Sequence, residues 1–224
     1  MIKLEHTETF NLEGAIRGMR NPFNSWEMSD SFWDMSSLDD NYVIGDNDHD
    51  LMMRLAKAGS DHRKFMRQIF VSVDITAPLY WWKEFDTYKV GTVANSCSTM
   101  HTIHKKEFEL DDFSHEDLVV SRLAEGQYCD YRIVLRYIIG ILNNSREMFN
   151  ETKDKGFWNA MIKLLPSSYN QKRTVTMNYE NLVNMYHARK THKLTEWHTF
   201  CDWIKELPYS EIITGGEMLN EEDS

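Results

Sequence analysis

Asn178 and Arg189 stand at a spacing that would place both on one face of a helix. The spacing from Asn178 through Leu182 to Arg189 predicts this face, because 11 residues at about 100° each return almost to the starting direction. An amide would lie at one end and a guanidinium at the other, and a guanidinium can hold a phosphate through two parallel hydrogen bonds. The ordinary alternative is that Asn178 caps the helix and Arg189 offsets the negative end of its dipole.

A second group of polar residues follows an apolar segment. Residues 69–76 alternate between apolar and polar, which predicts a half-buried strand, and Pro78 suits the first turn of a helix that we expect to reach Lys89. Small polar residues then predict a loop whose N–H groups and hydroxyls can approach an anion. They are Gly91, Thr92, Asn95, Ser96, Cys97, Ser98 and Thr99. A solvated connector is the alternative.

Other candidate residues point less clearly to chemistry. His101 and His104 are one helical turn apart, but no third ligand is spaced with them, so we expect no metal site. Cys97 has the chemistry of a nucleophile, yet no base stands nearby in sequence, which favours a packed thiol. Residues 171–173, Gln-Lys-Arg, form a basic turn before a predicted strand, and such a turn is either solvated surface or a site.

The elements that must position these residues predict an α+β fold. Apolar periodicity predicts helices over 12–20, 49–57, 79–89, 114–122, 128–149, 158–165, 178–189 and 195–206, and strands over 69–76 and 173–177. Residues 24–50 form a polar excursion with scattered aromatic residues, and 217–224 form an acidic tail that we expect to be frayed. We expect one domain over 1–224 with no internal repeat.

Composition limits the classes of function. The 224 residues are 42% hydrophobic, enough for a full core, and 10 glycines with 4 prolines argue against flexible linkers. A net charge of −10 excludes sequence-independent binding to a nucleic acid polymer, which needs a cationic surface. Three widely spaced cysteines predict reduced thiols. No apolar run predicts a membrane span or a signal peptide, so we expect a cytoplasmic protein.

The segment from Ala77-Pro78 onward resembles the flavin-dependent thymidylate synthases. In that family a strand ending near Ala-Pro leads into a helix that carries Arg-His-Arg, followed by a loop with Ser, Asn-Glu, Ser and Arg. Laid on without gaps, Arg-His-Arg falls on Thr87, Tyr88 and Lys89, and the loop pattern falls on Thr92, Ala94, Asn95, Cys97 and Thr99. Only Lys89 keeps its charge, so the order of the segments is retained while most of the signature residues are replaced.

Three more segments occur in the order that the family requires. Residues 15–20, Ala-Ile-Arg-Gly-Met-Arg, resemble the family's N-terminal Ala-x-Arg-x-x-Arg turn and are followed by Phe23. Residues 62–65, beginning with His62, stand where the family has a His-rich run that contacts the flavin. Leu165-Pro166 and the later residues Asn178, Leu182, Asn184 and Arg189 match the family's Leu-Pro and its Asn-bearing helix without a gap.

The resemblance implies a specific fold and activity. It implies a small antiparallel sheet with packed helices, FAD bound in a homotetramer, and transfer of the methylene of methylenetetrahydrofolate to dUMP or a related pyrimidine nucleotide, with reduction by the flavin. On this basis we expect Lys89 and Tyr88 to be catalytic, and His62, Thr87, Lys89 and Asn178 to bind the cofactor. The expected substrate-binding residues are Asn95, Ser96, Cys97, Ser98, Arg173 and Arg189.

A second interpretation stays open. Thr87 and Tyr88 cannot supply the positive charge of the arginine and histidine that they replace, and Lys89 stands alone. A protein that has lost catalysis and serves as a nucleotide-binding or assembly component would keep the same fold. Flavin retention separates the two interpretations, because only the enzyme requires the cofactor.

Overall fold

The computed structural model describes residues 2–36, 41–123 and 126–216. The chain divides into two compact units. Unit 1 comprises Met1–Lys3, Ile75–Thr87 and Asn95–Arg173, and unit 2 comprises Leu4–Asp74, Tyr88–Ala94 and Thr174–Ser224. The single domain expected from the sequence stays a prediction. The acidic tail over 217–224 lies outside the described residues.

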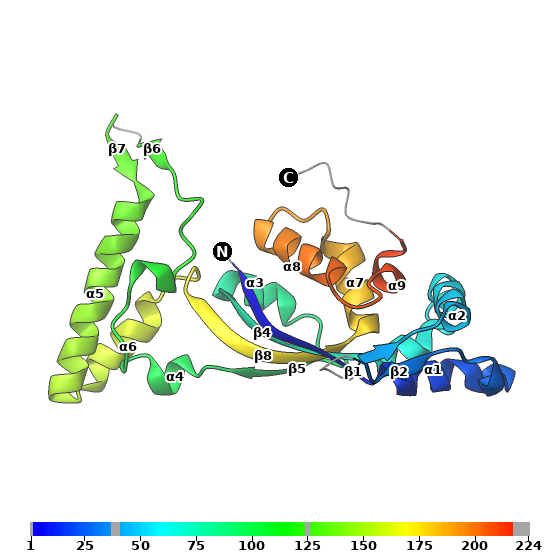
Figure 1. Cartoon of the computed structure of the whole chain (residues 1–224). Coiled ribbons are helices and arrows are strands. Elements are labelled where there is room, and N and C mark those ends of the chain that lie inside the picture. The colour runs from blue at the N-terminus through cyan, green and yellow to red at the C-terminus, as the bar shows by residue number, and fades with distance from the viewer. Residues whose placement is uncertain (1, 37–40, 124–125, 217–224) are drawn as a thin grey trace. The chain divides into compact units, whose positions relative to one another are not determined.

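A four-stranded sheet with strand order β1-β4-β8-β5 carries the candidate residues Asn95, Ser96, Arg173 and Asn178 (Figure 1). The strands are β1 (Lys3–Phe10), β4 (Phe70–Pro78), β8 (Asn170–Asn178) and β5 (Val93–Ser96). Alternation explains β4, because Val71, Val73 and Ile75 are fully buried while the residues between them are partly exposed. The structure thus confirms both strands predicted from the sequence. β1 was not predicted, since its eight residues are mostly polar and exposed.

Unit 2 places helices around a mixed apolar and aromatic core. Its helices are α1 (Leu12–Arg20), α2 (Asp46–Lys57), α7 (Tyr179–Arg189), α8 (Thr195–Lys205) and α9 (Glu211–Thr214), with short 3₁₀ helices η1 (Asn21–Phe23), η2 (Trp26–Met28) and η3 (Arg63–Gln68). α7 contacts α8, α9 and η3. Its residues Leu182 and Met185 are fully buried, so α7 is the central helix of this unit.

Unit 1 contains the longest helix that the structure describes, and a second helix lies next to it. They are α5 (Tyr131–Thr152) and α6 (Lys155–Leu164), and the shorter elements are α3 (Leu79–Phe85), α4 (Thr99–Thr102), η4 (Leu110–Asp112) and the strands β6 (Val120–Arg122) and β7 (Tyr128–Asp130). A core of Phe113, Leu142 and Met161 joins α5 and α6 to the segment after α4. Mixed helix and sheet confirm the predicted α+β class.

Several predicted boundaries were wrong for local reasons. The helix expected over 114–122 is a turn followed by β6, because adjacent branched residues favour a strand and Gly126, at φ +80°, turns the chain back into β7. The helix expected from residue 128 therefore begins at Tyr131, after β7. The excursion over 24–50 contains the antiparallel hairpin of β2 (Phe32–Asp34) and β3 (Asn41–Val43).

Two corrections affect the candidate site directly. The helix expected to reach Lys89 ends at Phe85, where the Thr87 hydroxyl donates to the carbonyl of Glu84 at 2.7 Å and closes the last turn. The expected small-polar loop is largely regular structure, since β5 occupies Val93–Ser96 and α4 follows from Thr99. Within the described ranges, no helix is both long and apolar enough to cross a membrane.

Candidate active site

Arg189 and Tyr88 lie together in unit 2 although 101 residues separate them in sequence. The Nε of Arg189 donates to the Tyr88 hydroxyl at 2.9 Å. The guanidinium carbon also lies 4.9 Å from the ring centroid of Trp197, which is fully buried. A guanidinium over an aromatic face is held by electrostatic attraction to the ring as well as by its hydrogen bonds. The structure thus gives Arg189 a fixed orientation at the end of α7.

Asn178 is the N-cap of α7. Its side chain accepts a hydrogen bond from the Asn181 backbone N–H at 2.9 Å, and the Asn181 side chain accepts from the Asn178 N–H at 3.2 Å. The Asn181 amide also donates to the Val90 carbonyl at 2.6 Å. Asn178 is 9% exposed, so the capping interpretation describes its side chain as it stands. A contact between Asn178 and a cofactor stays a prediction.

The face of α7 between these two residues does not line an open cleft. Leu182 and Met185 are fully buried in the core of unit 2. The Asn178 amide and the Arg189 guanidinium can therefore contact a ligand only near the two ends of α7. Gly91 lies beside the N-terminal end at φ +75°, with its Cβ position 3.0 Å from the Asn178 side-chain nitrogen. The backbone after α3 thus reaches the capped end of α7.

In unit 1, Arg173 lies over Trp82. The guanidinium carbon is 4.1 Å from the Trp82 ring centroid, and Nη1 pairs with Asp86 Oδ1 at 2.7 Å. Its Nε donates to Gln171 Oε1 at 3.0 Å. Only 15% of the Arg173 side chain is exposed, so this residue is held in place rather than extended into solvent. The predicted basic turn is therefore built into the sheet.

Gln171 connects Arg173 to the expected substrate segment. Its side-chain amide donates to the Cys97 carbonyl at 2.9 Å, and the Cys97 N–H donates to the Lys172 carbonyl at 3.0 Å. Asn95, Ser96 and Cys97 are exposed along this edge of the sheet, so the expectation of a packed thiol at Cys97 was wrong. These contacts place the predicted residues 95–97 and Arg173 in one cluster within unit 1.

Ser98 and the nearby histidines have local roles. The Ser98 hydroxyl accepts from the His101 N–H at 3.3 Å and caps the short helix α4. His104 packs its ring against Phe149 at a centroid distance of 5.1 Å. Among the described residues, no group of three or more His, Cys, Asp or Glu side chains could hold a metal ion.

Thr87 and Lys89 are exposed in the turn after α3. The Thr87 hydroxyl closes that helix, whereas no described residue accepts a hydrogen bond from the Lys89 ammonium. Lys89 therefore keeps its three donors for solvent or a ligand. Of the three positions that replace Arg-His-Arg, Tyr88 contacts Arg189 and Lys89 carries the charge.

His62 lines a cavity of about 420 Å³ in unit 2 together with residues from the N-terminal segment. Gly18 and Phe23 come from the Ala-x-Arg-x-x-Arg region, while His62 and Lys64 come from the segment before β4. Each of these two segments resembles a different segment of the flavin-dependent thymidylate synthases, and both line this one cavity. The lining combines the ring of Phe23 with the ammonium group of Lys64 and the carboxylate of Asp61. A ring can stack on a base and an ammonium group can pair with a phosphate, whereas Asp61 would repel one.

Sequence reasoning missed the residues that orient the candidate ones. They are Trp82, Asp86, Gln171, Asn181 and Trp197. Some act over long separations, since Asp86 lies 87 positions from Arg173 and Asn181 lies 91 positions from Val90. Only the aromatic residues gave a usable signal, because a buried tryptophan is a common partner for an arginine.

Comparison with known proteins shows which fold this architecture represents. The chain is similar to a flavin-dependent thymidylate synthase, ThyX, from Helicobacter pylori in complex with FAD and dUMP, with 19% identity, a TM-score of 0.65, and 94% of this chain and 95% of that chain covered. A second structure of ThyX from Helicobacter pylori with FAD and dUMP gives 17% identity, a TM-score of 0.63 and 94% coverage of each chain. The chain therefore has the fold of the flavin-dependent thymidylate synthases.

A further similar structure has a related but distinct activity in its name. It is the UMP/dUMP methylase PolB from Streptomyces cacaoi bound with 5-Br dUMP, with 16% identity, a TM-score of 0.62, and 96% of this chain and 95% of that chain covered. No family model matches the sequence. No curated protein matches it either. The resemblance in fold that was inferred from the order of the motif segments along the sequence is confirmed, and it extends over nearly the whole chain.

Proposed function

We propose that this protein methylates dUMP or a related pyrimidine nucleotide with the help of FAD. The observation that carries the proposal is the similarity in fold over 94% of the chain to a thymidylate synthase crystallised with FAD and dUMP. The similar UMP/dUMP methylase supports a pyrimidine nucleotide as the substrate class. Methylenetetrahydrofolate as the methylene donor is the finer part of the proposal and rests on the sequence resemblance. When bound, the flavin would supply the reducing hydride.

The residues of unit 2 would hold the cofactor and the phosphate. His62 and Lys64 line the cavity that would take part of FAD, with Lys89 and Asn178 as the other proposed contacts in this unit. Thr87, the last residue of the unit 1 segment before Tyr88, stays a proposed cofactor contact as well. Arg189 would bind the nucleotide phosphate, because Trp197 and Tyr88 fix the plane of its guanidinium. A fixed guanidinium loses less conformational entropy when it forms paired hydrogen bonds.

The residues of unit 1 would contact the substrate through the sheet edge. Asn95, Ser96, Cys97 and Ser98 carry exposed or partly exposed polar groups there, and Arg173 is tied to the same edge by Gln171. Asp86 already pairs with Arg173, which reduces the positive charge that Arg173 offers to an anion.

Lys89 is the strongest candidate for stabilising negative charge on the base, with Tyr88 as a hydrogen-bonding group beside it.

A specific observation favours a second function. The Arg-His-Arg positions hold Thr87, Tyr88 and Lys89, so two cationic or ionisable groups are missing where the family places them. A nucleotide-binding protein without catalysis would need Arg189 but not those charges. This alternative predicts nucleotide binding without flavin.

We also propose self-association, as the resemblance to a homotetrameric family implies. The helix α5 exposes Ile133 at 62%, Val134 at 44%, Tyr137 at 72% and Ile141 at 37%. Spacings of three and four residues place these side chains on one stripe. An apolar stripe of this length is typical of a helix that packs against another helix.

Arg189→Ala tests the phosphate role. We expect dUMP binding by the purified protein to weaken by about 1.5–3 kcal/mol, the usual size of a hydrogen bond to a charged group. Tyr88→Phe is the matched variant, since it removes the hydroxyl that Arg189 donates to and keeps the ring. Titration calorimetry with dUMP measures both variants. Unchanged dUMP affinity in Arg189→Ala would remove the phosphate role from this residue.

A further inference from the structure

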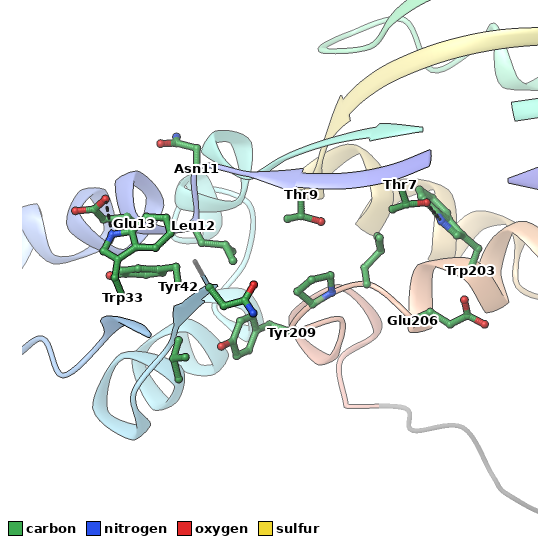
Figure 2. A pocket seen from close by; sticks show the side chains of 14 residues that line it. Thr7, Thr9, Asn11, Leu12, Glu13, Trp33, Tyr42, Trp203, Glu206 and Tyr209 are labelled. Carbon is green, nitrogen blue, oxygen red and sulfur yellow. Dashed lines mark hydrogen bonds between the residues drawn. The ribbon is translucent and has the colours of Figure 1, made fainter. Parts of the chain in front are cut away.

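Unit 2 contains a larger cavity that holds none of the candidate cofactor or substrate residues. Its volume is about 800 Å³, within the roughly 300–1,000 Å³ range of small-molecule sites. Side chains from β1, the start of α1, the β2–β3 hairpin, the end of α8 and the segment before α9 form its walls (Figure 2). The cavity is therefore separate from the one lined by His62.

Each end of this cavity pairs a carboxylate with an aromatic ring. At one end the Trp33 indole N–H donates to Glu13 Oε2 at 3.3 Å, and the rings of Trp33 and Tyr42 meet edge to face at 5.3 Å. Figure 2 shows Glu206 and Trp203 at the opposite end. There the Trp203 indole N–H donates to the Thr7 hydroxyl at 2.9 Å, which fixes that ring.

The charge of the lining selects the class of ligand. Glu13 and Glu206, both exposed, are the only acidic residues that line it, and no lysine, arginine or histidine lines the cavity. Neither carboxylate forms an ion pair with any residue in the described ranges. Arg17, one helical turn after Glu13 on α1, lies close enough to act on Tyr42 but does not line this cavity. Phosphates and other anions would therefore meet carboxylates with no lining cation, whereas an ammonium group would gain both a carboxylate and an aromatic face.

Aliphatic side chains also line the cavity. They come from Leu12, Val43 and Leu207, and the polar side chains of Thr9 and Tyr209 line the same cavity. The wall is also held in place, because the Tyr209 hydroxyl accepts from the Ile44 N–H at 2.9 Å and the Tyr179 hydroxyl donates to the Pro208 carbonyl at 2.6 Å. A preformed wall reduces the entropy cost of binding a flexible chain.

We propose that this cavity binds a linear aliphatic polyamine, with one ammonium group at Glu13 and another at Glu206. The aliphatic segment between the ammonium groups would pack against Leu12, Val43 and Leu207. This site goes beyond the proposed methylation and does not depend on it, since no residue is shared between the two.

Titration calorimetry of the full chain with spermidine tests the proposal. We expect Glu13→Gln and Glu206→Gln each to raise the dissociation constant about ten-fold or more, the scale of a lost hydrogen bond between charged groups. Glu8→Gln is the matched control. It removes the same charge at an exposed residue of β1 that does not line the cavity. That control should change the constant by less than about two-fold, since exposed charges act weakly at a distance.

Three outcomes would overturn the proposal. They are no spermidine binding by the unchanged protein at millimolar concentration, equal weakening in all three glutamine variants, and binding of n-butylamine as tight as that of spermidine. The second would show only general attraction to a chain of net charge −10. Thermal unfolding provides a second measurement, in which the same spermidine concentration should raise the melting temperature of the Glu8→Gln variant more than that of the Glu13→Gln variant.

Discussion

Both arginines that the sequence singles out lie against tryptophan rings. Arg189 lies over Trp197 and Arg173 over Trp82, at 4.9 Å and 4.1 Å from the ring centroids. A flat guanidinium keeps its in-plane N–H donors while its face rests on a ring, which an ammonium group cannot do. These positions therefore suit arginine in particular, whichever of the two proposed functions holds.

A buried carboxylate at Asp48 organises the excursion that the sequence left undefined. It accepts hydrogen bonds from Arg20, from the hydroxyls of Ser29 and Ser31, and from two backbone N–H groups of the same segment. Burial alone would raise the pKa of Asp48, but the bonds from Ser29, Ser31 and Arg20 outweigh it and hold the pKa below its ordinary value. The charged form therefore stabilises the folded chain.

Asp48→Asn should lower the free energy of unfolding at pH 7 by about 3 kcal/mol, because it leaves Arg20 buried without its carboxylate. The depressed pKa makes this stabilisation complete above about pH 4–5 and lost as the pH falls below that range. The difference in the free energy of unfolding between the original protein and Asp48→Asn should thus narrow in acid. Urea unfolding at pH 7 and pH 3 measures it.

Asp50→Asn provides the control, since Asp50 is exposed on the same helix. Its effect should stay within about 0.5 kcal/mol at both pH values. Equal effects of the two substitutions, or a gap for Asp48→Asn that is unchanged at pH 3, would contradict the role assigned to Asp48.

The junction between the turn after α3 and the start of α7 depends on a glycine. Gly91 has φ +75°, and a Cβ there would lie 3.0 Å from side-chain atoms of both Asn178 and Asn181. Those two residues form the capping box of α7. A side chain at position 91 would therefore strain the backbone and displace the cap together.

Gly91→Ala should reduce the free energy of unfolding by about 2 kcal/mol, which combines backbone strain with disturbance of the cap. Gly59→Ala separates these effects, because Gly59 has φ +101° with nothing within 4 Å of its Cβ position. It should cost about 1 kcal/mol from the backbone alone. Denaturant unfolding measures the free energy of unfolding of both variants, and an equal loss in the two would show that the cap does not contribute.

Periodicity predicted the helices and strands that bury one face. It failed for strands that form mainly by pairing with the backbone of a neighbouring strand. The helices over 12–20 and 195–206 and the central strands β4 and β8 were found because buried residues recur at the expected spacing. β1 and β5 carry few buried residues and are held by their neighbours' backbones, so no pattern marks them. The same limit explains why Arg173 and Arg189 were predicted without their partners.

At the scale of the whole molecule, the order of weak motifs was more informative than any one of them. Few signature residues are retained, yet four segments in the family's order agreed with a fold that covers nearly the whole chain. The fold could be predicted because the four segments keep the family's order along the chain. The activity could not, because it depends on charges such as those missing at Thr87 and Tyr88.

The apolar stripe of α5 gives a prediction about assembly. Ile133→Glu combined with Tyr137→Glu should convert a larger assembly to a monomer of 26.5 kDa, because two charges would have to be buried in the helix contact. Arg136→Glu, off the stripe on the same helix, should leave the assembly intact. Light scattering coupled to gel filtration measures the mass. A monomeric starting protein would contradict the assembly proposal.

The most direct test of the account is the visible absorbance spectrum of the purified protein with added FAD, recorded before and after addition of dUMP. The proposed function predicts retained flavin bands that dUMP perturbs, with the perturbation shifted to higher dUMP concentration in Arg189→Ala. A protein that takes up no FAD under these conditions would contradict the flavoenzyme proposal and leave the fold as that of a nucleotide-binding or assembly protein.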